Sequence, residues 1–269
     1  MQHLETSAGR VGFEDHGRGP AVVLLHANAH DHHDYDPIVE RLASTHRAIA
    51  VDWPGHGEST WTGKPADLTA IRFPSVLGQI LDHLALERAA LVGCSLGGFA
   101  AARYAIDNPN RVEALVVVNS GGFLDLSVVS RAFCRIMGNE RVNRRLMPRL
   151  IDLYMRAQTP SDKATVQRTK ARVVHADGVA FAAALWRSFL DPAYDLRRDA
   201  ARITCPTLIL SGAKDPIAGA KAARSTHKYL PGAELVLLPT GHLPFSSKPD
   251  EFLDHLDAFF LEASHSQIN

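Results

Sequence analysis

The chain has 269 residues, enough to form one large α/β domain or two small ones with a sizeable buried core. Its 29 lysines and arginines balance 29 aspartates and glutamates, so no overall field draws the protein to nucleic acid or to an anionic membrane. The three cysteines, Cys94, Cys134 and Cys205, are too few and too scattered for a disulfide framework. These numbers favour a small-molecule partner and a reducing, cytoplasmic setting.

The sequence also gives no sign of a membrane or export segment. Its N-terminus lacks the basic stretch followed by an apolar stretch that marks a signal peptide. The longest apolar runs, at 21–25 and 114–118, are far shorter than a membrane span. We therefore expect a soluble protein that is not exported. The sequence leaves the oligomeric state open between a monomer and a homodimer.

In the first half of the chain, short apolar runs alternate with segments of helical spacing. A first hairpin arm at 9–15 leads through a glycine-rich turn into a buried strand at 21–25. Pro74 should break or restart the helical pattern that surrounds it. Strands separated by helices indicate parallel pairing through right-handed crossovers, with both faces of the sheet covered. Further strands are expected at 46–52, 89–92 and 112–119, and helices at 35–43, 68–86 and 98–105.

The second half begins with a change of pattern. From 122 to 200 there is helical spacing only, as in Leu146, Leu150, Leu153 and Tyr154. The strand and helix alternation then resumes, so we expect an α/β core made of residues 1–121 and 201–269. Residues 122–200 are expected to be a helical cap inserted in that core. The resumed elements are expected at 206–211, 218–229, 234–238 and 249–261.

The stretch Gly93-Cys94-Ser95-Leu96-Gly97 lies between a predicted strand and a predicted helix that is rich in small residues. A serine on such a tight turn has an exposed hydroxyl, and the flanking glycines let neighbouring backbone pass without a clash. The pattern predicts that Ser95 is a nucleophile. The alternative is a glycine-rich turn with an idle serine.

A serine hydroxyl needs a general base and a group that orients the base. Asp215 and His242 each follow a predicted strand, and the carboxyl ends of parallel strands share one edge of a sheet. The chain order of Ser95, Asp215 and His242 is the one expected for a nucleophile, its orienting acid and its base in α/β-hydrolases. Alternatively, Asp215 only caps a helix and His242 is structural.

Taken together, these motifs resemble those of the α/β-hydrolase fold family over nearly the whole length of the chain. The matching stretches are Leu24-Leu-His26-Ala-Asn28, Asp52-Trp-Pro-Gly-His-Gly57-Glu-Ser59, Gly93-Cys-Ser95-Leu-Gly97, Ser211-Gly-Ala-Lys-Asp215 and Gly241-His242. The resemblance implies a doubly wound, mostly parallel sheet with an inserted helical cap. It also implies that Ser95 is the nucleophile, His242 the base and Asp215 its orienting carboxylate.

The resemblance further implies an oxyanion hole, formed by the backbone N–H groups of Asn28 and Leu96. The family usually has glycine where this chain has Ala27, a difference that bears on the local geometry. Relatives that open epoxides or displace halide use an aspartate nucleophile, so Ser95 argues against those reactions. The expected activity is that of a cofactor-free esterase or lactonase that acts through an acyl-serine.

Other readings remain open. The same triad occurs in relatives that cleave carbon–carbon bonds in ring-fission products, often with tryptophan after the histidine; here that residue is Leu243, although Arg187 could still bind a carboxylate. Some members of this fold act as small-molecule receptors that hydrolyse slowly if at all. Fast turnover of simple esters would indicate an enzyme and not a receptor.

The histidine-rich stretch from His26 to Asp34 raises the alternative of a metal site. Its spacing does not match H-x-H-x-D-H, and no H-E-x-x-H occurs elsewhere, so we expect no catalytic metal and a solvated loop at the pocket rim.

Residues 131–172 carry eleven basic side chains against three acidic ones. This excess either binds an anionic substrate or partner or lies on solvated helix faces, which is the commoner case.

Several large apolar side chains are candidates for the pocket lining, although most are expected to pack in the interior of the cap. They are Phe123, Phe133, Met137, Tyr154, Met155, Trp186 and Phe189, together with Leu243 after the candidate base.

Overall fold

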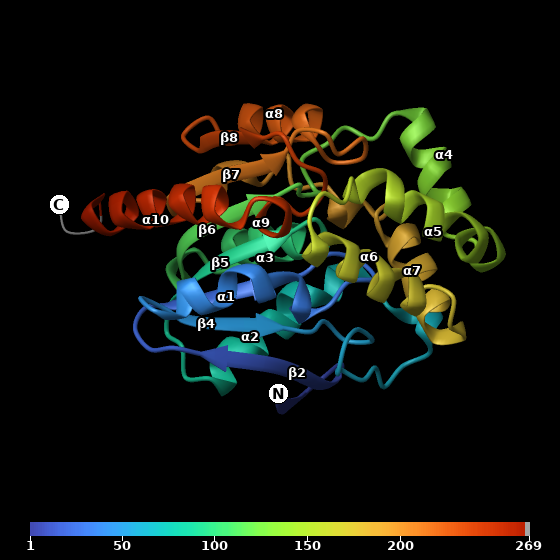
Figure 1. The fold of residues 1–269 in the computed structure, drawn as a ribbon, viewed down its shortest axis with the longest axis horizontal. Helices are drawn as coiled ribbons and strands as arrows, with labels where there is room; N and C mark the ends of the chain where they lie inside the picture. The colour runs from blue at the N-terminus through green and yellow to red at the C-terminus, as the bar shows by residue number, and fades with distance from the viewer. Residues whose placement is uncertain (267–269) are drawn as a thin grey trace.

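The computed structural model describes residues 1–266 as an eight-stranded sheet with helices on both of its faces (Figure 1). Strands β1 and β2 pair antiparallel, β2 and β4 also pair antiparallel, and every other neighbouring pair is parallel. The sheet order is β1-β2-β4-β3-β5-β6-β7-β8. This order confirms the doubly wound, mostly parallel architecture. The strands are β1 Gln2–Thr6, β2 Gly9–His16, β3 Ala21–Leu25, β4 Arg47–Val51, β5 Ala89–Cys94, β6 Val112–Val118, β7 Thr207–Gly212 and β8 Glu234–Leu238.

The helices follow the crossovers between the strands. Helices α4 to α7 all fall between β6 and β7. The helices are α1 Asp36–Ala43, α2 Phe73–His83, α3 Leu96–Asp107, α4 Val128–Met137, α5 Glu140–Met155, α6 Pro160–Arg172, α7 Ala176–Ser188, α8 Ala220–Tyr229, α9 Pro244–Ser247 and α10 Pro249–Ser266. Short 3₁₀ turns lie at η1 His32–Tyr35, η2 Pro65–Asp67, η3 Ala70–Arg72, η4 Pro109–Arg111, η5 Pro192–Tyr194 and η6 Ala200–Arg202.

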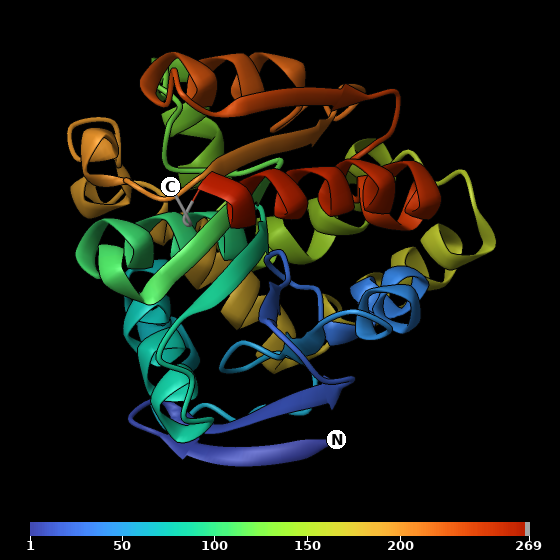
Figure 2. The same cartoon turned by 90° about the vertical axis from the view of Figure 1, so that its left-hand side faces the viewer.

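The central strands are buried on both faces, which explains why they read as continuous apolar runs. In β5, Ala89 and Leu91 join a core with α2 and α3, whereas Ala90 and Val92 join a core with α1 and α10. Figure 2 shows these helix layers on the two sides of the sheet. Strand β5 lies between β3 and β6, so the residue that follows it is at the centre of the sheet edge.

The start of the chain differs from the sequence-based prediction. The arm at 9–15 does pair in a hairpin, but its hairpin partner is β1, and its other neighbour is β4 rather than 21–25. Strand β1 has a single buried side chain, Leu4. A strand at the sheet edge with so few apolar residues has no periodic signal, which is why it was missed.

The predicted helix at 68–86 is shorter in the structure. Helix α2 begins at Phe73, with Pro74 in its first turn. A proline is tolerated there because the first backbone N–H groups of a helix have no partner within it. Pro74 therefore restarts the helix, and 3₁₀ turns occupy the residues before it.

No strand occurs among residues 122–200, and helices α4 to α7 lie beyond the arrowheads of the parallel strands in Figure 1. Of the residues with helical spacing, Leu146 and Leu153 on α5 are exposed, whereas Tyr154 lies on its buried face. That buried face consists of Asn143, Met147, Ile151, Tyr154 and Met155.

Among residues 1–266, no helix combines the length and the apolar character that a membrane-spanning segment requires.

The close approach of backbone at Gly97 leads to a stability prediction. A Cβ atom at this position would collide with the carbonyl of Leu25 on β3, in a part of the molecule that cannot relax easily. We expect Gly97→Ala to lower the free energy of unfolding by about 1–3 kcal/mol, measured by urea denaturation. Gly232→Ala is the matched control, because a Cβ there meets nothing within 4 Å. Equal stabilities of the two variants would contradict the packing described here.

Candidate active site

Ser95 occupies a sharp turn between β5 and α3. Its backbone has φ 53° and ψ −109°, in the left-handed half of the map that side chains rarely adopt. The turn is tied to its surroundings: the Ser95 N–H donates to the Val118 carbonyl at 2.8 Å, and the Phe99 N–H donates to the Ser95 carbonyl at 3.0 Å. Such strain persists only where the neighbouring structure enforces it, and it is typical of functional sites.

The glycines on either side of Ser95 allow this turn to form. A Cβ on Gly93 would collide with the backbone of Gly97 and Gly98, and one on Gly97 would collide with the Leu25 carbonyl. The spacing of the motif therefore follows from backbone crossing at two points, as the sequence predicted.

Asp215 and His242 come together behind the same edge of the sheet. Asp215 follows β7 and His242 follows β8, and His242 Nδ1 lies 2.6 Å from Asp215 Oδ2. Both residues are buried. His242 and Ser95 line the same cavity. The structure thus brings the three sequence-predicted residues to one place.

The electrostatics of this pair favour an ionised Asp215 and an oriented imidazole. Burial lowers the pKa of His242, but the neighbouring Cys94 and Asp215 raise it by more. Burial raises the pKa of the Cys94 thiol, so Asp215 is the neighbour that is charged at neutral pH. Burial also acts to raise the pKa of Asp215, yet His242 outweighs it and the pKa is lowered.

Asn119 holds Asp215 in place, a role that the sequence analysis did not assign. Its Nδ2 donates to Asp215 Oδ2 at 3.0 Å and to the carbonyls of Gly212 and Ala218 at 3.2 Å each. Its Oδ1 accepts from the Gly212 N–H at 2.8 Å. The only signal in the sequence was a polar residue directly after an apolar strand, which is common at strand ends.

The two backbone N–H groups expected to bind the oxyanion belong to Leu96 and Asn28. Leu96 is the first residue of α3, where a backbone N–H has no partner within the helix. Asn28 lines the cavity with Ala27. Ala27 has no positive φ; that conformation falls on Ala29, at φ 68°. The alanine that replaces the usual glycine therefore sits in ordinary backbone.

The cavity that contains Ser95 and His242 has a volume of about 680 Å³. Of the predicted pocket residues, Tyr154 and Trp186 line it, as do Phe133 and Phe189. Phe123 and Leu243 do not: both are fully buried and pack in the two hydrophobic cores. Met137 and Met155 are likewise core residues. Periodicity could not separate these groups, because both kinds of position are apolar.

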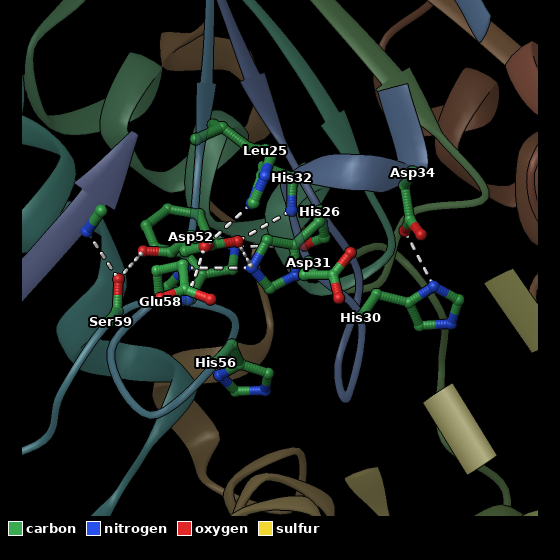
Figure 3. A network of polar contacts seen from close by, with 12 residues as sticks. Leu25, His26, His30, Asp31, His32, Asp34, Asp52, His56, Glu58 and Ser59 are labelled. Carbon is green, nitrogen blue, oxygen red and sulfur yellow. Dashed lines mark hydrogen bonds and ion pairs between the residues drawn. The ribbon is translucent and has the colours of Figure 1, made fainter. Parts of the chain in front are cut away.

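Apart from the exposed His33, the histidine-rich loop is buried, so the expectation of a solvated rim was wrong. Figure 3 shows its polar groups paired with one another and with Asp52. Asp52 accepts from the His32 backbone N–H at 2.8 Å and lies 2.9 Å from His32 Nδ1. His26 Nε2 accepts from the Trp53 N–H at 2.9 Å, and burial lowers the pKa of His26 to about 3. Pairing of these groups within the protein takes the place of solvent.

Among residues 1–266, no group of three or more histidine, cysteine or acidic side chains is arranged to hold a metal ion. In the loop, His26 and His32 instead have the protein partners just described.

Part of the basic excess at 131–172 is also used inside the molecule. Arg168 and Arg172 of α6 bind the buried Asp31, with N–O distances of 3.1 and 2.9 Å. Arg131 lines the cavity. Arg187, a possible carboxylate ligand by sequence, does not line it and donates to the backbone carbonyl of Gly138.

Known proteins resemble this chain in sequence and in fold. Residues 20–249 match the family model described as alpha/beta hydrolase fold. The chain is 30% identical over 274 residues to a pimeloyl-[acyl-carrier protein] methyl ester esterase of Nitrosomonas europaea, a match that covers 92% of this chain and 98% of that protein.

Among solved structures, an enol-lactonase of Burkholderia xenovorans superposes with a TM-score of 0.83 at 22% identity, over 97% of this chain and 100% of that one. An N-acyl homoserine lactone degrading enzyme superposes with a TM-score of 0.81 at 23% identity, over 96% and 100%. At these identities the superpositions show the shared fold.

The Asp215 carboxylate should control the titration of His242. We expect His242 to titrate above the ordinary value of 6.5 in the wild type, measured by imidazole NMR signals against pH. In Asp215→Asn the raising charge is lost while burial remains, so the pKa should fall below 6.5. Asp250→Asn, which removes an exposed carboxylate on α10, is the control and should leave it unchanged. An unperturbed His242 in the wild type would contradict the coupling.

Proposed function

The chain belongs to the α/β-hydrolase fold family, and we propose that it is a cofactor-free serine hydrolase of carboxylic esters or lactones. The observation that carries the proposal is the strained Ser95 turn in one cavity with His242, whose Nδ1 is 2.6 Å from Asp215. This arrangement matches what nucleophilic catalysis by serine requires: an exposed hydroxyl, a base and an orienting carboxylate.

In the proposed reaction, Ser95 Oγ attacks the ester carbonyl and its proton passes to His242 Nε2. Since Nδ1 faces Asp215, Nε2 is the nitrogen left for this transfer. The backbone N–H groups of Asn28 and Leu96 stabilise the oxyanion. The acyl carbon–oxygen bond breaks, and His242 returns the proton to the departing alcohol. Water, activated by the same imidazole, then hydrolyses the acyl-serine.

We further propose that residues 122–200 act as a cap that shapes the substrate pocket. Phe133 of α4, Tyr154 of α5 and Trp186 of α7 all line the cavity that contains Ser95. An apolar wall of this kind suits the hydrocarbon part of an ester or lactone. The matched relatives whose names state an activity include a methyl ester esterase and an enol-lactonase, which supports this substrate class.

The alternative readings are less well supported. Arg187, the residue considered as a carboxylate ligand for a carbon–carbon hydrolase, donates to the Gly138 carbonyl and does not line the cavity, although Arg131 does. Leu243, in the place where such enzymes often have tryptophan, is buried in the core. A receptor on this fold would bind without appreciable turnover, which the following experiment distinguishes.

Replacement of Ser95 tests the proposal. We expect Ser95→Ala to lower kcat/KM for p-nitrophenyl esters by at least about 10³-fold, since the nucleophile is lost while binding remains. Circular dichroism should show an unchanged fold. Ser264→Ala, on α10 away from the cavity, is the control. Full activity of Ser95→Ala would exclude the serine mechanism, and ligand binding without wild-type turnover would favour the receptor.

A further inference from the structure

A second aspartate–histidine–hydroxyl chain lies next to the candidate catalytic one. His30 Nδ1 lies 2.8 Å from Asp34 Oδ2, as Figure 3 shows, and His30 Nε2 lies 2.9 Å from the hydroxyl of Tyr154. All three side chains are buried, with at most 4% of each residue exposed. The proposed serine mechanism does not use them, although Tyr154 lines the same cavity as Ser95 and His242.

The charges around this chain determine which way its hydrogen bonds run. Asp31 and Asp34 face Arg168 and Arg172: Arg168 is 3.7 Å from Asp34 and 3.1 Å from Asp31, and Arg172 is 2.9 Å from Asp31. The guanidinium groups of Arg168 and Arg172 therefore balance the charge of these two carboxylates. A neutral imidazole has one N–H, and the nitrogen that faces a carboxylate is the one that carries it.

The 2.8 Å contact with Asp34 therefore favours the imidazole proton on His30 Nδ1, although the two groups are not aligned as a hydrogen bond, and leaves His30 Nε2 to accept from the Tyr154 hydroxyl. The phenol proton is then used in the bond to His30, so the phenolic oxygen can only accept hydrogen bonds in the cavity. Burial raises the pKa of Tyr154 well above its ordinary value, so the phenol does not ionise. Tyr154 is thus fixed as a hydrogen-bond acceptor.

The position of this acceptor is next to the reacting groups. The rings of Tyr154 and His242 have centroids 4.8 Å apart, and the His242 N–H donates to the Tyr154 carbonyl at 3.0 Å. Because Tyr154 also lines the cavity that contains Ser95, a substrate held at Ser95 lies beside it.

Other polar groups in the cavity also lack partners. The side-chain amide of Asn28 and the indole Nε1 of Trp186 are buried and make no hydrogen bond within the protein. Both residues are more than nine-tenths buried and line this cavity. Buried polar groups without partners are costly, so their presence here indicates a ligand with polar groups beyond the scissile carbonyl.

We propose that Tyr154 Oη accepts a hydrogen bond from the substrate, which is therefore an ester or lactone with a hydroxyl or amide N–H close to the scissile bond. This inference rests on the proposed ester hydrolase function. His30 and Asp34 are positioning residues in this account: they act on the substrate only by fixing the direction of the Tyr154 hydroxyl.

A set of matched methyl esters tests the inference. Methyl hexanoate has no second polar group, methyl 3-oxohexanoate adds an acceptor, and methyl 3-hydroxyhexanoate adds a hydroxyl donor. Methyl 2-acetamidohexanoate adds an amide N–H. We expect wild-type kcat/KM for at least one donor-bearing ester to exceed that for methyl hexanoate about tenfold, with no such gain for the oxo ester. The hydroxy and acetamido esters distinguish the two sources of the donor.

The variants separate the roles of the three residues. Tyr154→Phe keeps the ring and the backbone carbonyl that holds His242, so kcat/KM should fall about tenfold further for the donor-bearing ester than for methyl hexanoate. His30→Leu frees the Tyr154 hydroxyl to donate, so the ratio of hydroxy to oxo ester turnover should fall, which a purely structural loss would not change. Tyr104→Phe, a buried tyrosine outside the cavity lining, should keep the full gain.

Each outcome decides one claim. Equal turnover of all four esters by the wild type would overturn the inference and leave ester hydrolysis standing. A gain that survives Tyr154→Phe would also overturn it, by showing that another group receives the donor. No turnover of any ester, together with none of p-nitrophenyl esters, would overturn the proposed function itself.

Discussion

The backbone at Ser95 is the constraint on which the rest of the structure depends. A left-handed conformation costs a serine about 1–3 kcal/mol, so the turn must be enforced from outside. The Val118 carbonyl binds its N–H, and the Leu25 carbonyl packs against Gly97. Because β5 lies in the middle of the sheet, the loops that follow β3, β7 and β8 lie around the Ser95 turn. That placement lets residues far apart in sequence form one site.

Buried charge is the second organising feature, and it links the α4–α7 segment to the sheet. Arg168 and Arg172 of α6 pair with Asp31 in the loop after β3, and the Tyr154 carbonyl at the end of α5 binds the His242 N–H. Loss of either link would leave a buried polar group unpaired, which is strongly unfavourable. The pocket and the candidate base are therefore held by the same helices, so that changes in this segment act on both.

The sequence predicted those parts of the molecule that depend on local patterns. The sheet, the Ser95 turn and the strand-end positions of Asp215 and His242 follow from apolar runs and glycine spacing. Contacts between distant segments had no such signal: Asn119 beside Asp215, the burial of the histidine loop and the inward face of α5 all depend on packing. For the same reason, Phe123 and Leu243 could not be told from pocket residues such as Trp186.

The most direct test of the central claim is the mass of the protein during turnover. The wild type would be mixed with a p-nitrophenyl ester, quenched in acid within the first turnovers, and its peptides weighed. With such a good leaving group, acylation should outpace hydrolysis of the acyl-enzyme. We expect one acyl group, on the peptide that contains Ser95, which disappears when the ester is exhausted. Sustained turnover with that peptide unmodified, or an acyl group on another residue, would contradict it.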